Sequence, residues 1–381
     1  GRKEGPACGR MPYMSNACKA STGNDSICTK CIASIGRKEG PARERMPYGM
    51  SYMEARIMSK EVNTIGVLTS GGDAPGMNAA IRAVVRQAIS KGRKVKGIRR
   101  GYAGLLAEEI IDMDSHSVSE TIDKGGTILQ TARCKEFKKP EIVEKAAKIC
   151  AKHGIEGLVV IGGDGSFRGA TELAKHGVNT IGVPGTIDLD IGCTEYTIGF
   201  DTAVNTAMEA IDKIRDTSTS HERCSIVEVM GRGAGYIALW CGIANGAEDV
   251  LLPETYDYDE QKIVDHIIDS RRKGKQHHII INAEGIGHST SLAKRIEAAT
   301  GLETRATILG YMQRGGSPTA KDRVYASVMG AMAADLLCEG KTNRVVGYQH
   351  GEFVDFDIEE GLNMQKSIDE YQFEIAHLLS V

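Results

Sequence analysis

A glycine-rich turn after a short apolar run is the stretch of sequence whose chemistry is easiest to specify. Residues 158–161 have the continuous apolar character of a strand covered on both faces, and Gly162, Gly163 and Gly165 follow without a spacer. Ser166 has the residue type of a helix N-cap and precedes the apolar stripe of a helix. The N–H groups of such a turn, together with the positive end of the helix, favour an anion such as phosphate.

Asp164 lies within this turn. A carboxylate beside a bound phosphate is tolerated mainly when a divalent cation lies between them, so Asp164 is a candidate ligand for Mg²⁺. An isolated GGDG motif is also compatible with an ordinary αβ turn, so other features must decide.

Two further strand patterns end in polar loops that contain glycine. The pattern at 64–69 leads into SGGDAPG, and the pattern at 180–183 leads into PGTIDLD. Loops at the carboxyl ends of parallel strands share one crevice, so the three loops are expected to converge. Acids at i and i+2 of a loop, here Asp188 and Asp190, are usually solvated, but their place after a strand and a glycine favours a functional pair.

Helical patterns separate the strands. Apolar residues recur at i, i+3/i+4 and i+7 from Met77 to Ile89, and Arg82, Arg86 and Gln87 lie outside this stripe. Further helical patterns cover 141–153 and 201–216, and further strand patterns cover 225–229 and 278–282. The alternation of strands and helices predicts a doubly wound α/β protein.

The composition excludes several classes of protein. The 381 residues are 41% hydrophobic, which suffices for two domains with apolar cores, and no stretch approaches the length of a membrane span. A net charge of −3 and 5% aromatic residues argue against a nucleic-acid partner. The sequence has no apolar leader segment, and the six cysteines after residue 57, of ten in all, are scattered singly, so we expect a cytoplasmic protein with reduced thiols and no membrane partner.

Better-known nucleotide-binding motifs are absent. The GKT tripeptide at 340–342 has Asp335 where a P-loop needs its first glycine, and Arg168 stands where a dinucleotide-binding fingerprint needs glycine.

Residues 1–57 differ from the rest of the sequence. GRKEGPA occurs at 1–7 and again at 36–42, and the cysteines between the two copies have spacings that fit no common zinc finger. We expect a flexible or artefactual N-terminal extension, with a natural start near Met58.

Seven motifs in the remaining chain occur in an order that is specific to one family. They are TSGGDAPGMNAAIR (69–82), GGTILQTAR (125–133), IGGDGS (161–166), PGTID (184–188), IGFDTA (198–203), EVMGR (228–232) and QRGGSP (313–318). Through them, residues 65–381 resemble ATP-dependent 6-phosphofructokinase of the bacterial type. The resemblance implies two doubly wound three-layer α/β/α domains with mostly parallel sheets. It places ATP binding at 58–199 plus about 313–363, and sugar-phosphate binding at 200–312 plus about 364–381.

The resemblance also implies a reaction, in which MgATP phosphorylates the 1-hydroxyl of fructose 6-phosphate to give fructose 1,6-bisphosphate and ADP. This is the committed step of glycolysis. ATP contacts are implied for Gly72, Tyr102, Arg133, Cys134, Gly163, Asp164, Gly165, Ser166 and Gly169, with Mg²⁺ on Asp164. Asp188 matches the base that takes the proton of the 1-hydroxyl. Thr186 and Arg232 match groups that stabilise charge on the transferred group, Asp190 matches a second active-site acid, and Gly72 completes the catalytic set.

The resemblance further implies a sugar-phosphate site and an effector site. Sugar-phosphate contacts are implied for Thr186, Asp188, Asp190, Arg223, Met230, Gly231, Arg232, Glu284, Arg305, Tyr311 and Arg314. Arg223 and Arg305 match residues that a neighbouring subunit supplies, which implies a homotetramer with active sites at subunit interfaces. The allosteric effector site matches Arg82, Arg86, Arg215, Glu248, Lys273 and Lys275, and Ser115 replaces one of its arginines.

Two residues depart from the family pattern. Leu189 stands between the two acids where the family usually has Asn, and Tyr311 stands where the sugar-phosphate site usually has His. Leu cannot form the hydrogen bonds of Asn, and Tyr cannot become cationic. These departures leave an alternative, a non-catalytic or weakly active paralogue that regulates an active subunit. NAD and diacylglycerol kinases also carry GGDG, but they lack the other motifs.

Overall fold

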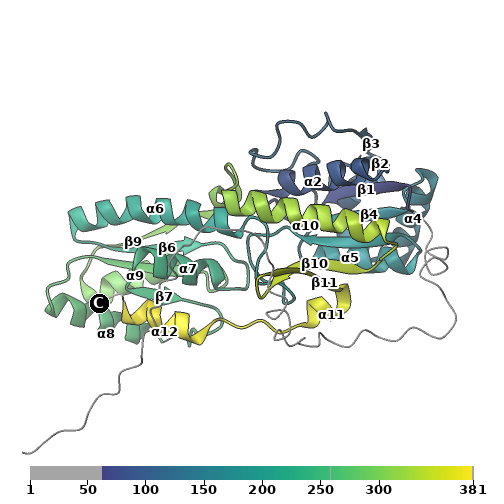
Figure 1. Cartoon of the computed structure of the whole chain (residues 1–381). Helices are drawn as coiled ribbons and strands as arrows, with labels where there is room; N and C mark the ends of the chain where they lie inside the picture. The colour runs from purple at the N-terminus through teal and green to yellow at the C-terminus, as the bar shows by residue number, and fades with distance from the viewer. Residues whose placement is uncertain (1–61, 258, 380–381) are drawn as a thin grey trace, which may run out of the picture. The chain divides into compact units, whose positions relative to one another are not determined.

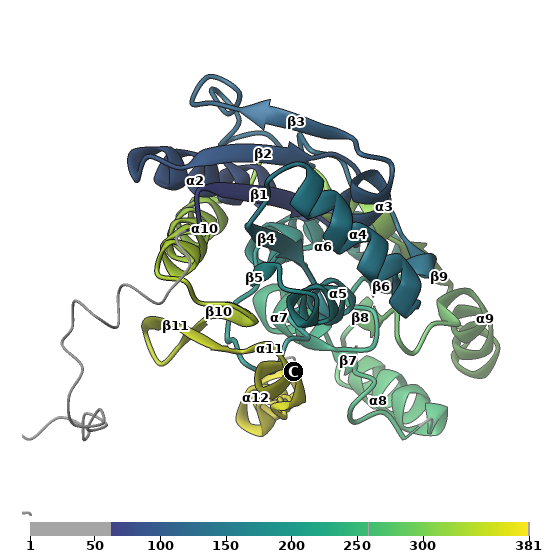
Figure 2. The same ribbon diagram turned by 90° about the vertical axis from the view of Figure 1, so that its right-hand side faces the viewer.

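Two β-sheets organise the chain, of which the computed structural model describes residues 62–257 and 259–379. The first sheet has the strand order β11-β10-β5-β4-β1-β2-β3, much of which can be followed in Figure 2, and the second has the order β7-β8-β6-β9. The first sheet consists of β1 (Thr64–Thr69), β2 (Lys94–Ile98), β3 (Ile110–Met113), β4 (Gly157–Gly162), β5 (Asn179–Pro184), β10 (Arg344–Gln349) and β11 (Glu352–Asp357). The second consists of β6 (Cys224–Val229), β7 (Asp249–Leu251), β8 (His278–Ala283) and β9 (Thr304–Ile308). The extension predicted at 1–57 lies outside the described residues.

Parallel pairing dominates both sheets. The antiparallel pairs in the described residues are β2 with β3 and β10 with β11, at the two edges of the first sheet. Every residue of β1 and β4 is buried, as expected for central parallel strands that carry helices on both faces. The prediction of doubly wound α/β architecture with mostly parallel sheets is confirmed.

Helices cover both faces of each sheet (Figure 1). On the first sheet, one face carries α2 (Met77–Ser90) and α10 (Ala320–Cys338), and the other carries α3 (Gly101–Leu106), α4 (Pro140–Lys152), α5 (Asp164–Lys175) and α11 (Ile358–Asn363). On the second sheet, one face carries α6 (Phe200–His221) and α7 (Tyr236–Asn245), and the other carries α8 (Glu260–Arg272) and α9 (Ser289–Thr300). The remaining elements are α12 (Glu370–Leu378), which packs on α7, and the 3₁₀ turns η1 (Lys135–Lys138) and η2 (Gly310–Arg314).

Two features are absent from the residues that the structure describes, a membrane-spanning helix and a disulfide bond. None of their helices combines the length and apolar character needed to cross a membrane. Their cysteines form no disulfide with one another.

The start of α5 differs from the sequence prediction. Gly163, in extended backbone, is the N-cap, and the helix begins at Asp164, so the N-cap prediction for Ser166 is wrong. Ser166 lies in the first helical turn, and its hydroxyl donates to the Ser70 carbonyl at 3.1 Å instead of capping the helix. The serine therefore ties α5 to the loop that follows β1.

Asp322, in the first turn of α10, is fully buried and joins this helix to the start of α6. Its carboxylate accepts hydrogen bonds from the Tyr196 hydroxyl at 2.6 Å, the Gly199 N–H at 2.7 Å and the Thr202 N–H at 2.9 Å. The Thr202 hydroxyl also donates to it. A buried carboxylate is tolerated when its oxygens are this well satisfied, so Asp322 acts as an internal clamp between two helices.

We predict that Asp322→Ala lowers the free energy of unfolding by about 3–5 kcal/mol, because the buried donors lose their acceptor. Urea denaturation measures the change. Asp216→Ala, which removes an exposed acid of α6, is the control and should change stability by less than about 0.5 kcal/mol. Equal stabilities of the two variants would contradict the clamp.

Candidate active site

The loops after β1, β4 and β5 meet at the edge of the first sheet that is formed by the carboxyl ends of its parallel strands, because these three strands are neighbours. Backbone hydrogen bonds continue from the strands into the loops: the Ser70 N–H donates to the Ile161 carbonyl, and the Gly185 N–H donates to the Gly162 carbonyl, both at 2.9 Å. The structure thus brings together the three polar loops that the sequence singles out.

The glycine-rich turn after β4 leaves space for a ligand. A Cβ atom on Gly162 would lie 2.4 Å from the Ser70 carbonyl oxygen, so close packing of the two loops requires glycine there. At Gly165, by contrast, an added Cβ would meet none of the described residues within 4 Å. Gly165 is exposed at the positive end of α5, where an anion is stabilised.

A wall of the turn is formed by Tyr102. Its hydroxyl donates to the Ser166 carbonyl at 2.6 Å, and its ring stacks on Phe137 at a centroid distance of 4.0 Å. The ring also packs on Gly169, where an added Cβ would lie 2.9 Å from it. Arg133 is exposed and Cys134 half-buried in the segment between this wall and the loop after β1.

The same segment is tied to the loop after β1 through Thr131, whose hydroxyl donates to the Gly71 carbonyl at 2.8 Å. Gly72 lies against a different partner, since an added Cβ would be 2.5 Å from Nη1 of Arg314. That guanidinium donates to the Asp73 carbonyl at 3.0 Å. Arg314 therefore lies at the first loop although it belongs to η2, and the GGTILQTAR and QRGGSP segments both meet the loop after β1.

Asp188 has the electrostatic character of a reactive acid. Its side chain is buried, and its Oδ1 has no hydrogen-bond partner among the described residues. Burial, reinforced by the nearby Asp190 carboxylate, raises the pKa of Asp188 to about 6. The Arg314 guanidinium opposes this rise. A buried, unpaired carboxylate oxygen with a raised pKa is typical of functional sites.

The other groups of this loop are arranged around Asp188. The Asp188 N–H donates to the Thr186 hydroxyl at 3.3 Å. Burial also raises the pKa of Asp190, and the Arg232 guanidinium, whose Nη1 lies 4.0 Å from Asp190 Oδ2, counteracts it. Leu189, between the acids, has a left-handed backbone with φ of 57°, which is costly for a residue with a branched side chain.

Residues from the second sheet reach this edge because β6 and β8 end side by side. Met230 and Gly231 follow β6, and Glu284 follows β8. The Arg232 N–H donates to the Glu284 carboxylate, and the Met230 N–H donates to the side chain of the buried Gln313 at 3.3 Å. Tyr311, on η2, is 82% exposed, so its side chain is directed to solvent.

Two predicted arginines do not join this group. Arg223 and Arg305 both pair with Glu303, at 2.6 and 2.7 Å. Arg223 immediately precedes β6, whereas Met230 immediately follows it, and six residues of strand separate the ends by ~20 Å. Within one chain, these two arginines therefore lie at the opposite end of the second sheet.

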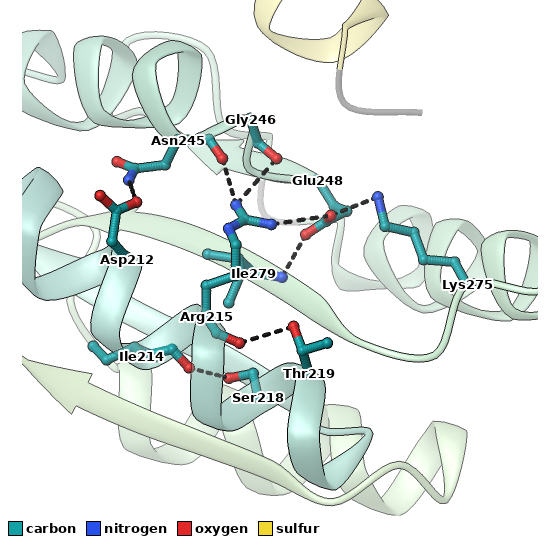
Figure 3. Close-up of polar contacts among 10 residues, drawn as sticks. All are labelled: Asp212, Ile214, Arg215, Ser218, Thr219, Asn245, Gly246, Glu248, Lys275 and Ile279. Carbon is teal, nitrogen blue, oxygen red and sulfur yellow. Dashed lines mark hydrogen bonds and ion pairs between the residues drawn. The ribbon is translucent and has the colours of Figure 1, made fainter.

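Three of the predicted effector residues form a cluster on the second sheet (Figure 3). Glu248, which is fully buried, pairs with Lys275 Nζ at 2.6 Å and with Arg215 Nη1 at 3.9 Å, and accepts the Ile279 N–H. Arg215 also donates to the Gly246 carbonyl at 3.2 Å.

The other predicted effector residues lie elsewhere. Lys273 is exposed at the end of α8. Arg82 is half-buried and Arg86 exposed on α2, which packs against the first sheet and α10, whereas Arg215 belongs to α6 on the second sheet. Within one chain the structure does not bring the two groups of cations together.

Asp164 fits a magnesium ion. Mg²⁺ is usually held by one or two carboxylates and completes its coordination with phosphates and waters, so one carboxylate beside an anion site is a suitable donor set. Asp164 lies at the first position of α5, and Arg168 Nε donates to its Oδ1 at 2.9 Å. Over residues 62–257 and 259–379, no cluster of three or more His, Cys, Asp or Glu side chains suited to a metal is present.

Lys366 is a residue of this region that the sequence did not reveal. Its ammonium donates to the Leu189 carbonyl at 3.0 Å and to the Thr194 carbonyl at 2.8 Å. Leu189 and Lys366 are 177 residues apart, and the lysine lies in a polar stretch without a motif. No sequence signal could have found it, since only the packing of α11 and α12 brings it here.

Comparisons with known proteins agree on one family. The model of the family described as "Phosphofructokinase" matches residues 64–337. ATP-dependent 6-phosphofructokinases of Clostridium botulinum and Clostridium acetobutylicum are each 58% identical to the chain over 319 residues, which is 84% of this chain and 100% of theirs. The solved phosphofructokinase of Saccharomyces cerevisiae superimposes with a TM-score of 0.73 at 34% identity, covering 84% of this chain and 48% of the yeast chain.

The raised pKa of Asp188 predicts how Asp188→Asn affects stability. The folded-state pKa of about 6 lies above the ordinary value of 3.8, so the ionised carboxylate disfavours the folded state, and this effect grows as pH rises from 4 to 6. We expect Asp188→Asn to be at least as stable as the wild type at pH 8, with the difference disappearing near pH 4. Urea unfolding at both pH values measures this, and a variant less stable than the wild type at pH 8 would contradict it.

Proposed function

Because the chain belongs to the phosphofructokinase family, we propose that it phosphorylates fructose 6-phosphate at the 1-hydroxyl with MgATP, giving fructose 1,6-bisphosphate and ADP in glycolysis. The observation that carries this function is the buried Asp188 carboxylate with its unpaired oxygen, beside a glycine-rich turn at the positive end of α5. Together they supply a base and an anion site at one edge of the sheet.

The nucleotide lies against the loops after β1 and β4 in this proposal. The backbone around Gly163, Gly165 and Ser166 receives the phosphates, with Arg133 as an additional cation, and Tyr102 and Gly169 form the wall of the site. Asp164 holds Mg²⁺, which neutralises phosphate oxygens when it is bound.

Asp188 acts as the base. Its carboxylate accepts the proton of the sugar 1-hydroxyl as that oxygen forms a bond to the γ-phosphorus. The bond from the γ-phosphorus to the bridging oxygen breaks, and ADP leaves with the electron pair. Thr186, Gly72 and Arg232 surround the transferred group, where fixed dipoles and a cation stabilise the charge that develops on its oxygens.

The sugar phosphate lies toward the second sheet. Met230, Gly231 and Glu284 follow neighbouring strands. They lie near the acidic loop, which is the segment 188–190 after β5, because Arg232 contacts both Glu284 and Asp190. Arg314 adds a cation near Asp188. Tyr311 is exposed and free to turn toward a ligand. This arrangement gives the sugar hydrogen-bonding groups on one side and the acidic pair on the other.

Arg223 and Arg305 fit a shared site. Their distance from Met230 within one chain means that they can reach a sugar phosphate only on a neighbouring copy, with Glu303 holding both guanidinium groups in place. A guanidinium fork suits a phosphate because it donates two parallel hydrogen bonds. We therefore propose that active sites lie at subunit interfaces. The family resemblance adds to the proposal that the assembly is a homotetramer and that it is located in the cytoplasm.

ATP is favoured over pyrophosphate as the donor. The open space at Gly165 accommodates the remainder of a nucleotide, and an added Cβ at Gly185 would lie 2.9 Å from Ile161 and 3.1 Å from Met77, so a larger residue there requires these side chains to shift. The pyrophosphate-dependent branch of the family typically has Asp and Lys at these two positions. No observation favours the alternative of a non-catalytic paralogue, since the acids Asp164, Asp188 and Asp190 and the cations Arg133, Arg232 and Arg314 are present.

The function is tested by a coupled assay of ADP formation with the full chain, with and without fructose 6-phosphate. We expect ADP release to depend on the sugar phosphate and on Mg²⁺, and pyrophosphate to be the poorer donor. Absence of sugar-dependent ADP formation, or faster turnover with pyrophosphate, would contradict the proposal.

We predict that Asp188→Asn lowers kcat by at least ~10²-fold while the KM values for both substrates change little, because general-base catalysis contributes about 10²–10⁴-fold. The base must be ionised, so wild-type activity should fall as pH drops through about 6, the pKa of Asp188. Steady-state kinetics from pH 5 to 9 measure both effects. A variant with wild-type kcat would remove Asp188 from this role.

The effector site supplies a prediction about regulation. Ser115, which replaces a family arginine, is exposed just after β3. A missing charge-assisted hydrogen bond costs roughly 1.5–3 kcal/mol, about ten- to a hundredfold in affinity. The family resemblance implies that this site binds a nucleoside diphosphate or phosphoenolpyruvate. Ser115→Arg should therefore lower the half-effect concentrations of ADP and phosphoenolpyruvate by at least about tenfold. The control Ser119→Arg adds the same charge nearby, and equal responses of the two variants would contradict a specific role of this position.

A further inference from the structure

Lys366 forms a contact that the proposed reaction does not yet use. It lies between α11 and α12, where the chain passes from the first sheet to the second. Its ammonium bonds to two carbonyls of the acidic loop region, those of Leu189 and Thr194, and lies 4.9 Å from the centre of the Tyr236 ring. The lysine thus fastens the C-terminal segment to the backbone between the two active-site acids.

The peptide that Lys366 holds is strained. Leu189 has φ of 57°, a conformation that costs roughly 1–2 kcal/mol for a residue with a Cβ atom. Its aliphatic side chain is buried and offers no hydrogen bond that could stabilise the turn locally. The bond from Lys366 to the Leu189 carbonyl acts on the backbone itself and does not depend on the side chain of residue 189.

The position of the lysine has an electrostatic cost. Burial lowers the pKa of Lys366 to about 8, although the Asp190 carboxylate opposes that shift. A buried ammonium is unfavourable unless its hydrogen bonds and charge are used. Here the hydrogen bonds go to the acidic loop, and the charge lies near one of the two acids.

We propose that Lys366 is a positioning residue for phosphoryl transfer, which fixes the left-handed peptide of Leu189 and thereby the directions of the Asp188 and Asp190 carboxylates. The inference rests on the function proposed above. In this proposal Lys366 contacts the backbone and not the substrate. Its loss should lower the rate of the chemical step more than the affinity for substrate, because a small displacement of a base from the proton it accepts lowers the rate first.

The first test compares variants of the full chain. Lys366→Met keeps the length of the side chain and removes the donors, Lys366→Arg keeps them, and Lys145→Met changes an exposed lysine of α4 as a matched control. We expect Lys366→Met to lower kcat on the order of 10-fold or more with KM values within about twofold. Lys366→Arg should recover most of kcat, and Lys145→Met should match the wild type. An unchanged kcat in Lys366→Met would overturn the proposal.

A second test needs no activity. Hydrogen–deuterium exchange of peptides that cover 186–194 should accelerate in Lys366→Met and not in Lys145→Met, because the loop loses its anchor. Unchanged exchange there would overturn the proposal. If the wild type formed no sugar-dependent ADP, the proposed function would fail, and this measurement would still decide whether Lys366 holds the loop. Should Lys366→Met not fold, Lys366→Leu, which also removes the donors, serves in both tests.

A third test asks whether the lysine acts through Leu189. Asn tolerates the left-handed conformation better than Leu, so Leu189→Asn should need the anchor less. We expect Lys366→Met to reduce kcat by a smaller factor in the Leu189→Asn background than in the wild type. Equal factors in both backgrounds would show independent sites and would overturn the link to the Leu189 peptide.

Discussion

The candidate active site depends on the parallel adjacency of β1, β4 and β5, whose faces are covered by helices on both sides. The loops that follow parallel strands lie at the same edge of the sheet. Burial on both faces fixes the register of the strands, because a slip of one residue would exchange the side chains of the two apolar layers. The Ser70–Ile161 and Gly185–Gly162 backbone bonds extend this order beyond the strands. The positions of three loops from distant parts of the sequence therefore follow from one sheet.

The edge concentrates features that oppose stability. The Asp188 carboxylate is buried with an unpaired oxygen, Leu189 has an unfavourable backbone, and Lys366 is a partly buried ammonium. Each costs free energy, and an apolar core beneath both sheets must offset these costs. Backbone strain at Leu189 and an unpaired carboxylate oxygen at the adjacent Asp188 are expected where the local geometry is needed for catalysis at a cost in folding stability.

The second sheet presents different groups at its two ends. The carboxyl ends of β6 and β8 direct Met230, Arg232 and Glu284 to the acidic loop, whereas Arg223 and Arg305 stand at the opposite end, held by Glu303. One copy therefore has the reacting groups of the proposed reaction without these two cations at its own site. The buried Glu248 similarly holds Arg215 and Lys275, away from the arginines of α2.

The sequence by itself determined the α/β class, the strand at Thr64–Thr69, the apolar stripe of α2 and the three polar loops, because periodicity and glycine placement are local signals. It placed the helix start wrongly at Ser166, because the tie of its hydroxyl to Ser70 depends on a strand almost 100 residues earlier. Only the tertiary structure decided the left-handed conformation of Leu189, the raised pKa of Asp188 and the contact with Lys366. Burial, backbone strain and long-range hydrogen bonds arise when distant segments pack together, and no local pattern encodes them.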